Sequence, residues 1–343
     1  MRLSEFDYVL PTELIAQEPV IEREKSRLLV LHRESGRIEH RTFIDILEYL
    51  SPGDLAVFND TRVTAARLRG RKETGGGVEA LMLRRVDSSR WEALVKPGRR
   101  VHIGAKLFFG DQLEADVVER TPDGGRILEM RPTDKAGELI EKLGETPLPP
   151  YITRPSRQSD KERYQTVYAR ANGSYAAPTA GLHFTPELIA ELRKKGVGTT
   201  FITLHVGIGT FRPVRVENVL EHEMHSEFVE VGSEAAKAVS EAVGKIVVVG
   251  TTTARALESA ACASTEGRLH SVDKFHGETD LFIKPGYSFR VIDRLVTNFH
   301  LPKSTLLILV SAFAGTDLIR RAYEEAVAQR YRFLSFGDAM LII

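Results

Sequence analysis

The chain has 343 residues, 42% of them hydrophobic and 27% charged, which predicts a folded globular protein large enough for two domains. Its 47 basic and 47 acidic residues cancel, so no overall field attracts nucleic acid, and any basic surface has to be local. A single cysteine excludes an internal disulfide framework, and we find neither a signal peptide nor an apolar run long enough to span a membrane, so we expect a cytoplasmic protein.

The first 66 residues alternate between strand-like and helix-like patterns. Residues 28–31 and 55–58 are apolar runs of strand length, and apolar residues at helical spacing over 43–50 predict a helix between them. The second strand ends in a polar run, Asn59-Asp60-Thr61-Arg62. This alternation indicates an α/β domain.

The pattern changes between residues 67 and 150. Short β-like runs alternate with turns, and strands at this spacing predict a small barrel or sandwich. The runs are 78–83, 91–95, 106–109, 113–118 and 126–130. We therefore expect residues 67–150 to be a β domain inserted into an α/β domain made of residues 1–66 and 151–343.

The α/β alternation resumes after residue 150. Strands are expected at 197–206, 245–250 and 291–297, and an amphipathic helix over 318–327. Ser304 is a suitable N-cap for a helix over 306–314, although this apolar run could also be a strand.

Residues 174–209 carry the strongest local signals. Thr185 and Pro186 fit the cap and first turn of a helix that follows His183, and the next strand ends at His205 before Gly207 and Gly209. Helix N-termini attract anions, and strand ends in α/β sheets line ligand crevices, so chemistry is expected here.

Histidines at element boundaries are candidates for proton transfer, because neutral imidazole titrates near physiological pH. A lone histidine is more often structural, but five in the second half of the chain lie beside loop residues. They are His183, His205, His222, His225 and His300.

Two stretches resemble known binding motifs but lack features that those motifs require. His222 and His225 with Glu227 could be zinc ligands, but no cysteine pair supports them and their spacing differs from the helical zinc-protease pattern, so we expect no metal. The glycines at 207 and 209 lack the third glycine of a dinucleotide loop, because Arg212 occupies that position. These glycines more simply let the backbone approach a ligand.

Basic residues are concentrated between residues 62 and 100, which favours a phosphate-contacting face, although solvated strand edges are an alternative. The segment 151–170 adds Arg163, Tyr164 and Tyr168, which could contact an RNA backbone and stack on a base, or could simply form a linker between domains. The residues expected to bind RNA are Arg62, Arg67, Arg69, Arg99, Arg100, Arg163, Tyr164, Tyr168 and Lys303.

Seven motifs in a fixed order resemble the S-adenosylmethionine:tRNA ribosyltransferase-isomerases of queuosine biosynthesis, over the chain from residue 14 to its end. Two departures, at Ile208 and at Thr253-Ala254, concern only pocket shape. The motifs are NDTR (59–62), ERYQTVYA (162–169), AAPTAGLHFTPEL (176–188), TLHVGIGTFRPV (203–214), HEMHSE (222–227), TDLFIKPGY (279–287) and TNFHLPKSTLL (297–307).

The resemblance implies an enzyme with a barrel-like α/β main domain and a smaller β-barrel domain that works without a metal. Such an enzyme moves the ribosyl part of S-adenosylmethionine, its co-substrate, onto 7-aminomethyl-7-deazaguanine at the wobble position of tRNA. The product is epoxyqueuosine, and adenine and methionine are released. The alternatives are an RNA-binding module without catalysis and an RNA methyltransferase that uses the same co-substrate.

Within this reading, His205 or His183 is expected to be the base, and His225 or His300 to serve the departing adenine. Asp60 and Glu227 are expected to orient the histidines or to hold ribose hydroxyls. The residues expected to bind S-adenosylmethionine are Thr179, Gly181, Phe184, Gly207, Gly209, Thr210, Thr252 and Asn298. The net charge of zero favours a monomer.

Overall fold

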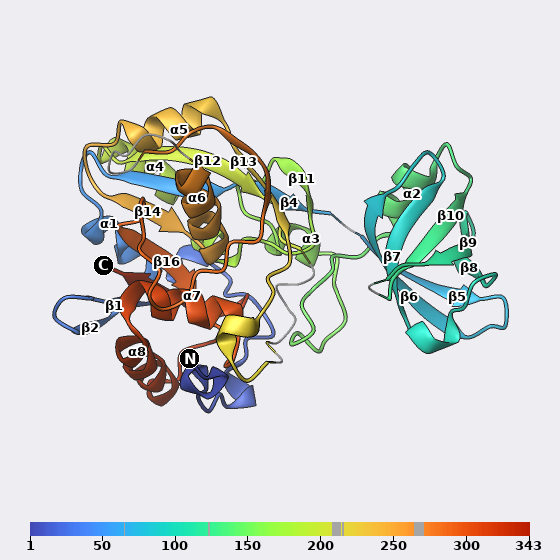
Figure 1. Ribbon diagram of the computed structural model, residues 1–343, viewed down its shortest axis with the longest axis horizontal. Coiled ribbons are helices and arrows are strands. Elements are labelled where there is room, and N and C mark those ends of the chain that lie inside the picture. Colours follow the sequence, from blue (N-terminus) through green and yellow to red (C-terminus); the bar gives the residue numbers. More distant parts are fainter. Residues whose placement is uncertain (65, 123, 208–213, 215, 264–270) are drawn as a thin grey trace. The chain divides into compact units, whose positions relative to one another are not determined.

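The computed structural model describes residues 1–64, 66–122, 124–207, 214, 216–263 and 271–343 (Figure 1). The chain divides into two compact units. The main unit comprises Met1–Arg62, Pro149–Arg154 and Gln165–Ile343, and the barrel unit comprises Val63–Leu148 and Pro155–Tyr164. No helix among the described residues combines the length and apolarity needed to cross a membrane.

A nine-stranded mixed sheet forms the centre of the main unit (Figure 1). In spatial order its strands are β15 (Phe275–Thr279), β13 (Glu227–Val231), β12 (Gly198–Leu204), β3 (Leu55–Asn59), β14 (Ile246–Val249), β16 (Arg294–Asn298), β17 (Ala339–Ile342), β1 (Arg27–Leu31) and β2 (Ile38–Thr42). The four strands β12, β3, β14 and β16 run parallel to one another. The α/β class is confirmed, but this sheet has two edge strands, β15 and β2, and does not close into the barrel-like form we expected.

Helices cover both faces of this sheet, which is why its inner strands read as continuous apolar runs. Leu55 and Val57 of β3 face one core and Ala56 and Phe58 face the other, as the two-residue period of a strand requires. The first core is completed by α5 (Ser233–Ser240), α6 (Thr251–Ala263), α7 (Thr305–Ala314) and α8 (Thr316–Ala328), and the second by α1 (Ile46–Tyr49) and α4 (Pro186–Lys194).

Two helix starts carry the caps that the sequence predicted. Thr185 Oγ1 accepts a hydrogen bond of 3.1 Å from the Leu188 N–H at the start of α4. Ser304 Oγ accepts one of 3.2 Å from the Leu307 N–H, so the apolar run after it is the helix α7 rather than a strand.

The barrel unit is a closed six-stranded β-barrel, as the resemblance implied. Around the barrel its strands are β10 (Arg126–Arg131), β7 (Arg90–Lys96), β6 (Gly77–Arg85), β5 (Arg67–Lys72), β8 (Lys106–Phe109) and β9 (Leu113–Arg120). The unit also contains α2 (Ala136–Leu143) and α3 (Asp160–Arg163). Strand β5 escaped sequence analysis because its outward positions are arginines, whereas Leu68 alone turns a large apolar side chain into the core.

The remaining elements of the two units are short. Strand β4 (Thr61–Val63) pairs with β11 (Ala171–Ser174) in a two-stranded sheet. The 3-10 helices are η1 (Leu3–Phe6), η2 (Thr12–Leu14), η3 (Arg23–Lys25), η4 (Phe43–Asp45), η5 (Gly98–Arg100), η6 (Thr179–His183) and η8 (Val219–Glu221).

Candidate active site

A cavity of about 390 Å³ lies in the main unit where the parallel strands end. It is bordered by Val206 after β12, by Gly250 after β14 and by residues 297–302, which include the end of β16. The carboxyl ends of parallel strands are where α/β sheets place their ligand crevices. Its other lining residues are Pro150, Tyr151, Ala176, Ala177, Pro178, Thr179, Ala180, Thr251, Thr252, Ser304, Leu306, Leu334 and Ser335.

A second, smaller cavity of about 40 Å³ shares Thr251, Thr252 and Leu306 with the first. Thr251 and Thr252 form the first turn of α6, so the N-terminus of this helix borders both cavities. The remaining lining residues are His222, Met224, His225, Glu227, Arg255, Leu281, Phe282, Ile283, Thr305 and Leu309. We refer to the two as the large cavity and the small cavity.

His300 borders the large cavity and is held from several sides. Its Nε2 lies 2.8 Å from Thr297 Oγ1, its backbone N–H donates to the Tyr323 hydroxyl, and its carbonyl accepts from the Tyr8 hydroxyl. Burial lowers the pKa of His300 to about 3, because the imidazolium would lose its hydration. The ring is therefore neutral at physiological pH and fixed in orientation.

His183 does not border either cavity among the residues described, contrary to its expected role as a base. Its Nδ1 lies 2.7 Å from Ser26 Oγ, its Nε2 lies 3.2 Å from Asn298 Nδ2, and its ring stacks on Phe43. Because the amide nitrogen of Asn298 can only donate, Nε2 accepts and Nδ1 carries the proton. Burial, together with the charges of nearby arginines, lowers the pKa of His183 to about 3. Both ring nitrogens of His183 therefore have hydrogen-bond partners in this structure.

His205 also lies outside the lining of the two cavities. Its Nδ1 lies 2.7 Å from Thr61 Oγ1, and its ring stacks on Phe228 at 5.4 Å. A Cβ at Gly173 would approach Nε2 to 2.8 Å, so only glycine fits above the ring. Partial burial lowers the pKa of His205, and the negative charge of Asp60 opposes that effect.

Asp60 forms its hydrogen bonds with Thr203 and with the segment around Arg170, and none of them is with a histidine. Its Oδ2 accepts from the Arg170 guanidinium at 2.6 and 3.0 Å, and its Oδ1 accepts from Thr203 Oγ1 at 2.7 Å. Its carbonyl accepts the N–H groups of Arg170 and Ala171. Asp60 is buried, and these contacts leave it no place at either cavity.

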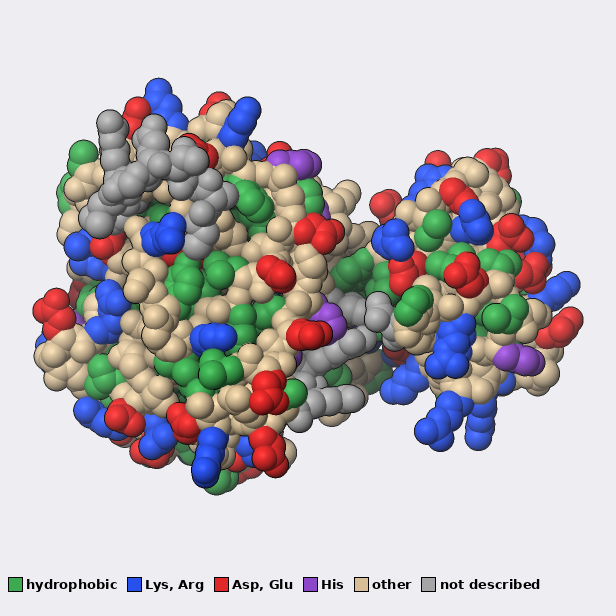
Figure 2. Space-filling view, viewed as in Figure 1, with side chains coloured by type: hydrophobic (Ala, Val, Ile, Leu, Met, Phe, Trp, Pro, Cys, Tyr) green, Lys and Arg blue, Asp and Glu red, His purple; other side chains and the backbone are tan. Residues whose placement is uncertain are grey.

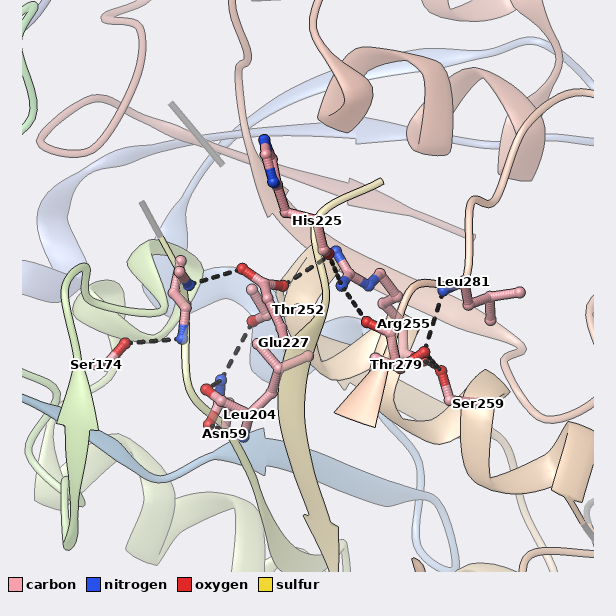
Figure 3. A network of polar contacts seen from close by, with 12 residues as sticks. Asn59, Ser174, Leu204, His225, Glu227, Thr252, Arg255, Ser259, Thr279 and Leu281 are labelled. Carbon is pink, nitrogen blue, oxygen red and sulfur yellow. Dashed lines mark hydrogen bonds and ion pairs between the residues drawn. The ribbon is translucent and has the colours of Figure 1, made fainter. Parts of the chain in front are cut away.

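Glu227 and Arg255 form a buried ion pair at the small cavity (Figure 3). Glu227 Oε2 lies 3.0 Å from Arg255 Nη1, and Glu227 Oε1 accepts the Gly207 N–H at 2.8 Å. Arg255 Nη2 donates to the carbonyls of His225 and Thr279 at 3.3 and 3.0 Å. The pair thus joins the Gly207 segment, the His225 segment and the end of β15.

The residues expected to bind S-adenosylmethionine fall into three groups. Thr179, Thr252 and Asn298 line the large cavity, and Gly207 lies next to Val206 of its lining. Phe184 does not line either cavity; the residue is 1% exposed and its ring packs edge-on against Phe43 and Phe58 in the core. Gly181 instead makes room for Tyr168, whose hydroxyl would lie 2.0 Å from an added Cβ. Gly209 and Thr210 lie outside the described residues.

The expected RNA contacts are also divided. Tyr164 is fully buried and the Tyr168 hydroxyl is buried, so neither ring is free to stack on a base as we had expected. Other expected contacts have partners of their own: Arg67 pairs with Glu79, Arg69 with Glu145 and Lys303 with Asp7. Arg163 belongs to α3, whereas Arg62, Arg99 and Arg100 are exposed.

The loop that carries Arg99 and Arg100 is braced by the buried side chain of Arg126. The Arg126 guanidinium donates to the carbonyls of Gly98, Val101, Gly124 and Gly125 at 2.8 to 2.9 Å. Neither Arg99 nor Arg100 has an ion pair among the described residues. Figure 2 shows Lys and Arg side chains gathered on one part of the barrel unit. The loop therefore carries two exposed positive charges on a braced backbone.

Among the described residues, no group of three or more His, Cys, Asp or Glu side chains is arranged to hold a metal ion. Sequence analysis missed Arg255, Ser335 and Tyr151 as site residues. The signal for Arg255 was present, since it lies one helical turn after the threonines that follow β14, on the α6 face that reaches the small cavity.

Comparisons with known proteins show the family of this chain. The family model described as queuosine biosynthesis protein matches residues 3–342. The S-adenosylmethionine:tRNA ribosyltransferase-isomerase of Symbiobacterium thermophilum is 58% identical over 348 residues, and that of Clostridioides difficile is 52% identical over 347, each covering 100% of both chains. The crystal structure of the S-adenosylmethionine tRNA ribosyltransferase from Thermotoga maritima is 44% identical, covers 99% of this chain and 100% of its own, and has a TM-score of 0.56. The chain therefore belongs to the queuosine biosynthesis protein family, as its motifs predicted.

Proposed function

We propose that this enzyme transfers and isomerises the ribosyl moiety of S-adenosylmethionine onto 7-aminomethyl-7-deazaguanine at the tRNA wobble position, with the large cavity as its reaction site. The product is epoxyqueuosine, with release of adenine and methionine. Full-length relatives that carry this activity in their names support the proposal. The observation that carries the site is that two family motifs, 176–180 and 297–302, meet in the lining of one cavity.

The large cavity suits a nucleoside. Its volume of about 390 Å³ lies in the range of small-molecule sites, which are mostly apolar with a few polar groups. Thr179, Thr252 and Asn298 supply such groups, while Pro178 and Phe299 supply apolar surface. We assign these residues to S-adenosylmethionine.

The proposed chemistry begins at the sulfonium, which acidifies the adjacent C5′ hydrogens. A base removes one of them to give an ylide, elimination opens the ribose to an aldehyde, and adenine departs with a proton. The exocyclic amine then adds, and attack of the ylide on the aldehyde closes the carbon ring and the epoxide as methionine leaves. His300 is our first candidate for proton transfer, because its ring borders the cavity and is fixed by Thr297 Oγ1. A proton received there is easily passed on to departing adenine, since burial disfavours the imidazolium. His225, at the small cavity, is the second candidate.

The RNA partner is a tRNA, and we assign Arg99 and Arg100 of the braced loop, together with Arg62, to its phosphates. Arg67, Arg69, Arg163 and Lys303 are assigned supporting contacts after local rearrangement of their partners. A monomer acting in the cytoplasm without a metal completes the proposal.

Incubation with S-adenosylmethionine and precursor-bearing tRNA, followed by mass analysis of nucleosides and small molecules, tests this function. Release of adenine and methionine with gain of the epoxy-cyclopentane-diol on the base is the expected result. Release of S-adenosylhomocysteine would instead identify a methyltransferase. Tight tRNA binding with no small-molecule product would identify a binding module.

A further inference from the structure

The Glu227–Arg255 pair is unusual because two opposite charges are buried beside an open space. Their side chains are 4% and 10% exposed, and both line the small cavity. A buried ion pair contributes little net stability, because desolvation offsets the attraction between the charges. Its position at a cavity therefore calls for a reason other than stability.

Both side chains are held in place by hydrogen bonds to the backbone. Glu227 is fixed by the Gly207 N–H, and Arg255 is fixed by the carbonyls of His225 and Thr279 (Figure 3). The Nε–H of Arg255 has no hydrogen-bond partner among the described residues, so the protein does not use all donors of the guanidinium. The cavity wall thus presents a fixed positive and a fixed negative group 3.0 Å apart.

We propose, building on the function above, that the small cavity binds the amino-acid end of S-adenosylmethionine, with its carboxylate at Arg255 and its ammonium at Glu227. A zwitterion matches a wall that carries both charges, whereas a ligand with one charge leaves one of the two groups without compensation. The carboxylate also lies near Thr251 and Thr252, in the first turn of α6, where the helix dipole favours an anion.

The sizes and continuity of the cavities agree with this division. A volume of about 40 Å³ admits a small head group but no nucleoside, whereas about 390 Å³ admits adenosine. Thr251, Thr252 and Leu306 border both, so a single molecule can extend from one to the other. The sulfonium then lies at the boundary, and the two leaving products depart from different compartments.

Decarboxylated S-adenosylmethionine, which lacks only the carboxylate, tests the proposal. Wild-type enzyme should use S-adenosylmethionine more than tenfold better than this analogue in kcat/KM, measured as adenine release with precursor-bearing tRNA. Arg255→Met should lower kcat/KM for S-adenosylmethionine while leaving that for the analogue nearly unchanged. In Arg255→Met the preference for S-adenosylmethionine over the analogue should therefore fall below about threefold. The comparison is a double-mutant cycle in which one change is made in the protein and the other in the ligand.

Binding of the two products gives a readout that does not depend on turnover. Glu227→Gln should weaken methionine binding at least tenfold by calorimetry and leave adenine binding unchanged. The matched control is Arg294→Lys, which alters another ion pair with a buried carboxylate, Arg294–Asp54 at 3.3 Å, away from both cavities. This control should keep wild-type affinity for both products.

Equal use of the two co-substrates by wild-type enzyme would overturn the proposal without any variant, and so would undiminished methionine binding by folded Glu227→Gln. Failure of the proposed function has a different signature. In that case wild-type enzyme would release no adenine or methionine from either co-substrate, while calorimetry with methionine would still decide whether the small cavity is an amino-acid site.

Discussion

The amide nitrogen of Asn298 lies 3.2 Å from His183 Nε2, so a residue of the cavity lining is held by a histidine that the cavity does not reach. The same nitrogen also donates to the Leu334 carbonyl at 3.1 Å. We propose that His183 acts on the site through Asn298, as a positioning residue rather than a proton-transfer group.

Replacement of His183 by Ala should therefore damage stability before it damages chemistry. Loss of two buried hydrogen bonds and of the stacked ring is expected to cost about 2–4 kcal/mol in the free energy of unfolding. At a temperature where the variant is folded, turnover should persist with an unchanged pH profile of kcat. Denaturant melts and steady-state kinetics check this, and a thousandfold loss of kcat in an equally stable variant would contradict it.

Stability should fall as the pH drops below about 6.5. Burial lowers the pKa of His183 and of His300 from 6.5 to about 3, so the unfolded chain takes up protons in this range while the folded chain does not. The contribution of the two histidines to the free energy of unfolding is fully present above pH 6.5. As the pH falls toward 3, each histidine lowers the free energy of unfolding by about 1.4 kcal/mol per pH unit. Urea unfolding at several pH values measures the slope, which His300→Gln should reduce and the exposed His276→Gln should not.

His300→Gln tests the proposed proton transfer. Glutamine keeps polar atoms in the position but cannot carry a proton between groups, so kcat should fall by about 10²–10⁴-fold with little change in KM for S-adenosylmethionine. Folding can be verified by the melting curve in the same preparation. Retention of more than a tenth of wild-type kcat would transfer the role to another residue, with His225 next in line.

Arg99→Gln combined with Arg100→Gln should weaken tRNA binding and make it less sensitive to salt. The slope of log affinity against log salt should decrease by about one unit for each phosphate contact removed. Arg84→Gln is the matched control, because Arg84 is already paired with Glu92 at 2.7 Å on the same barrel. Equal salt slopes for all three proteins would exclude the loop from the RNA interface.

The sequence predicted the elements that carry their own local signals. The caps Thr185 and Ser304, the buried strand β3 and the amphipathic α8 were all foreseen, because spacing and capping are properties of neighbouring residues. Strand β5 was not, since its partners β6 and β8 rather than its own composition make it a strand.

The site was predicted less fully, because distances between distant residues decide it. His183 and His300 have similar contexts in sequence, each beside a polar or glycine-containing loop, yet one is enclosed by Ser26, Phe43 and Asn298 and the other borders the cavity. Arg255 lies within a helix and far along the chain from Glu227, so only the folded chain reveals that the two form a pair.

The contacts of Asp60 with the residues around Arg170 have a consequence for protein engineering. They fasten the strand that leaves the main sheet to the segment that comes back, independently of what the chain does in between. A version in which a short linker replaces the excursion would inherit a junction that is already closed, so we expect the nine-stranded sheet to accept a different inserted domain between these two segments.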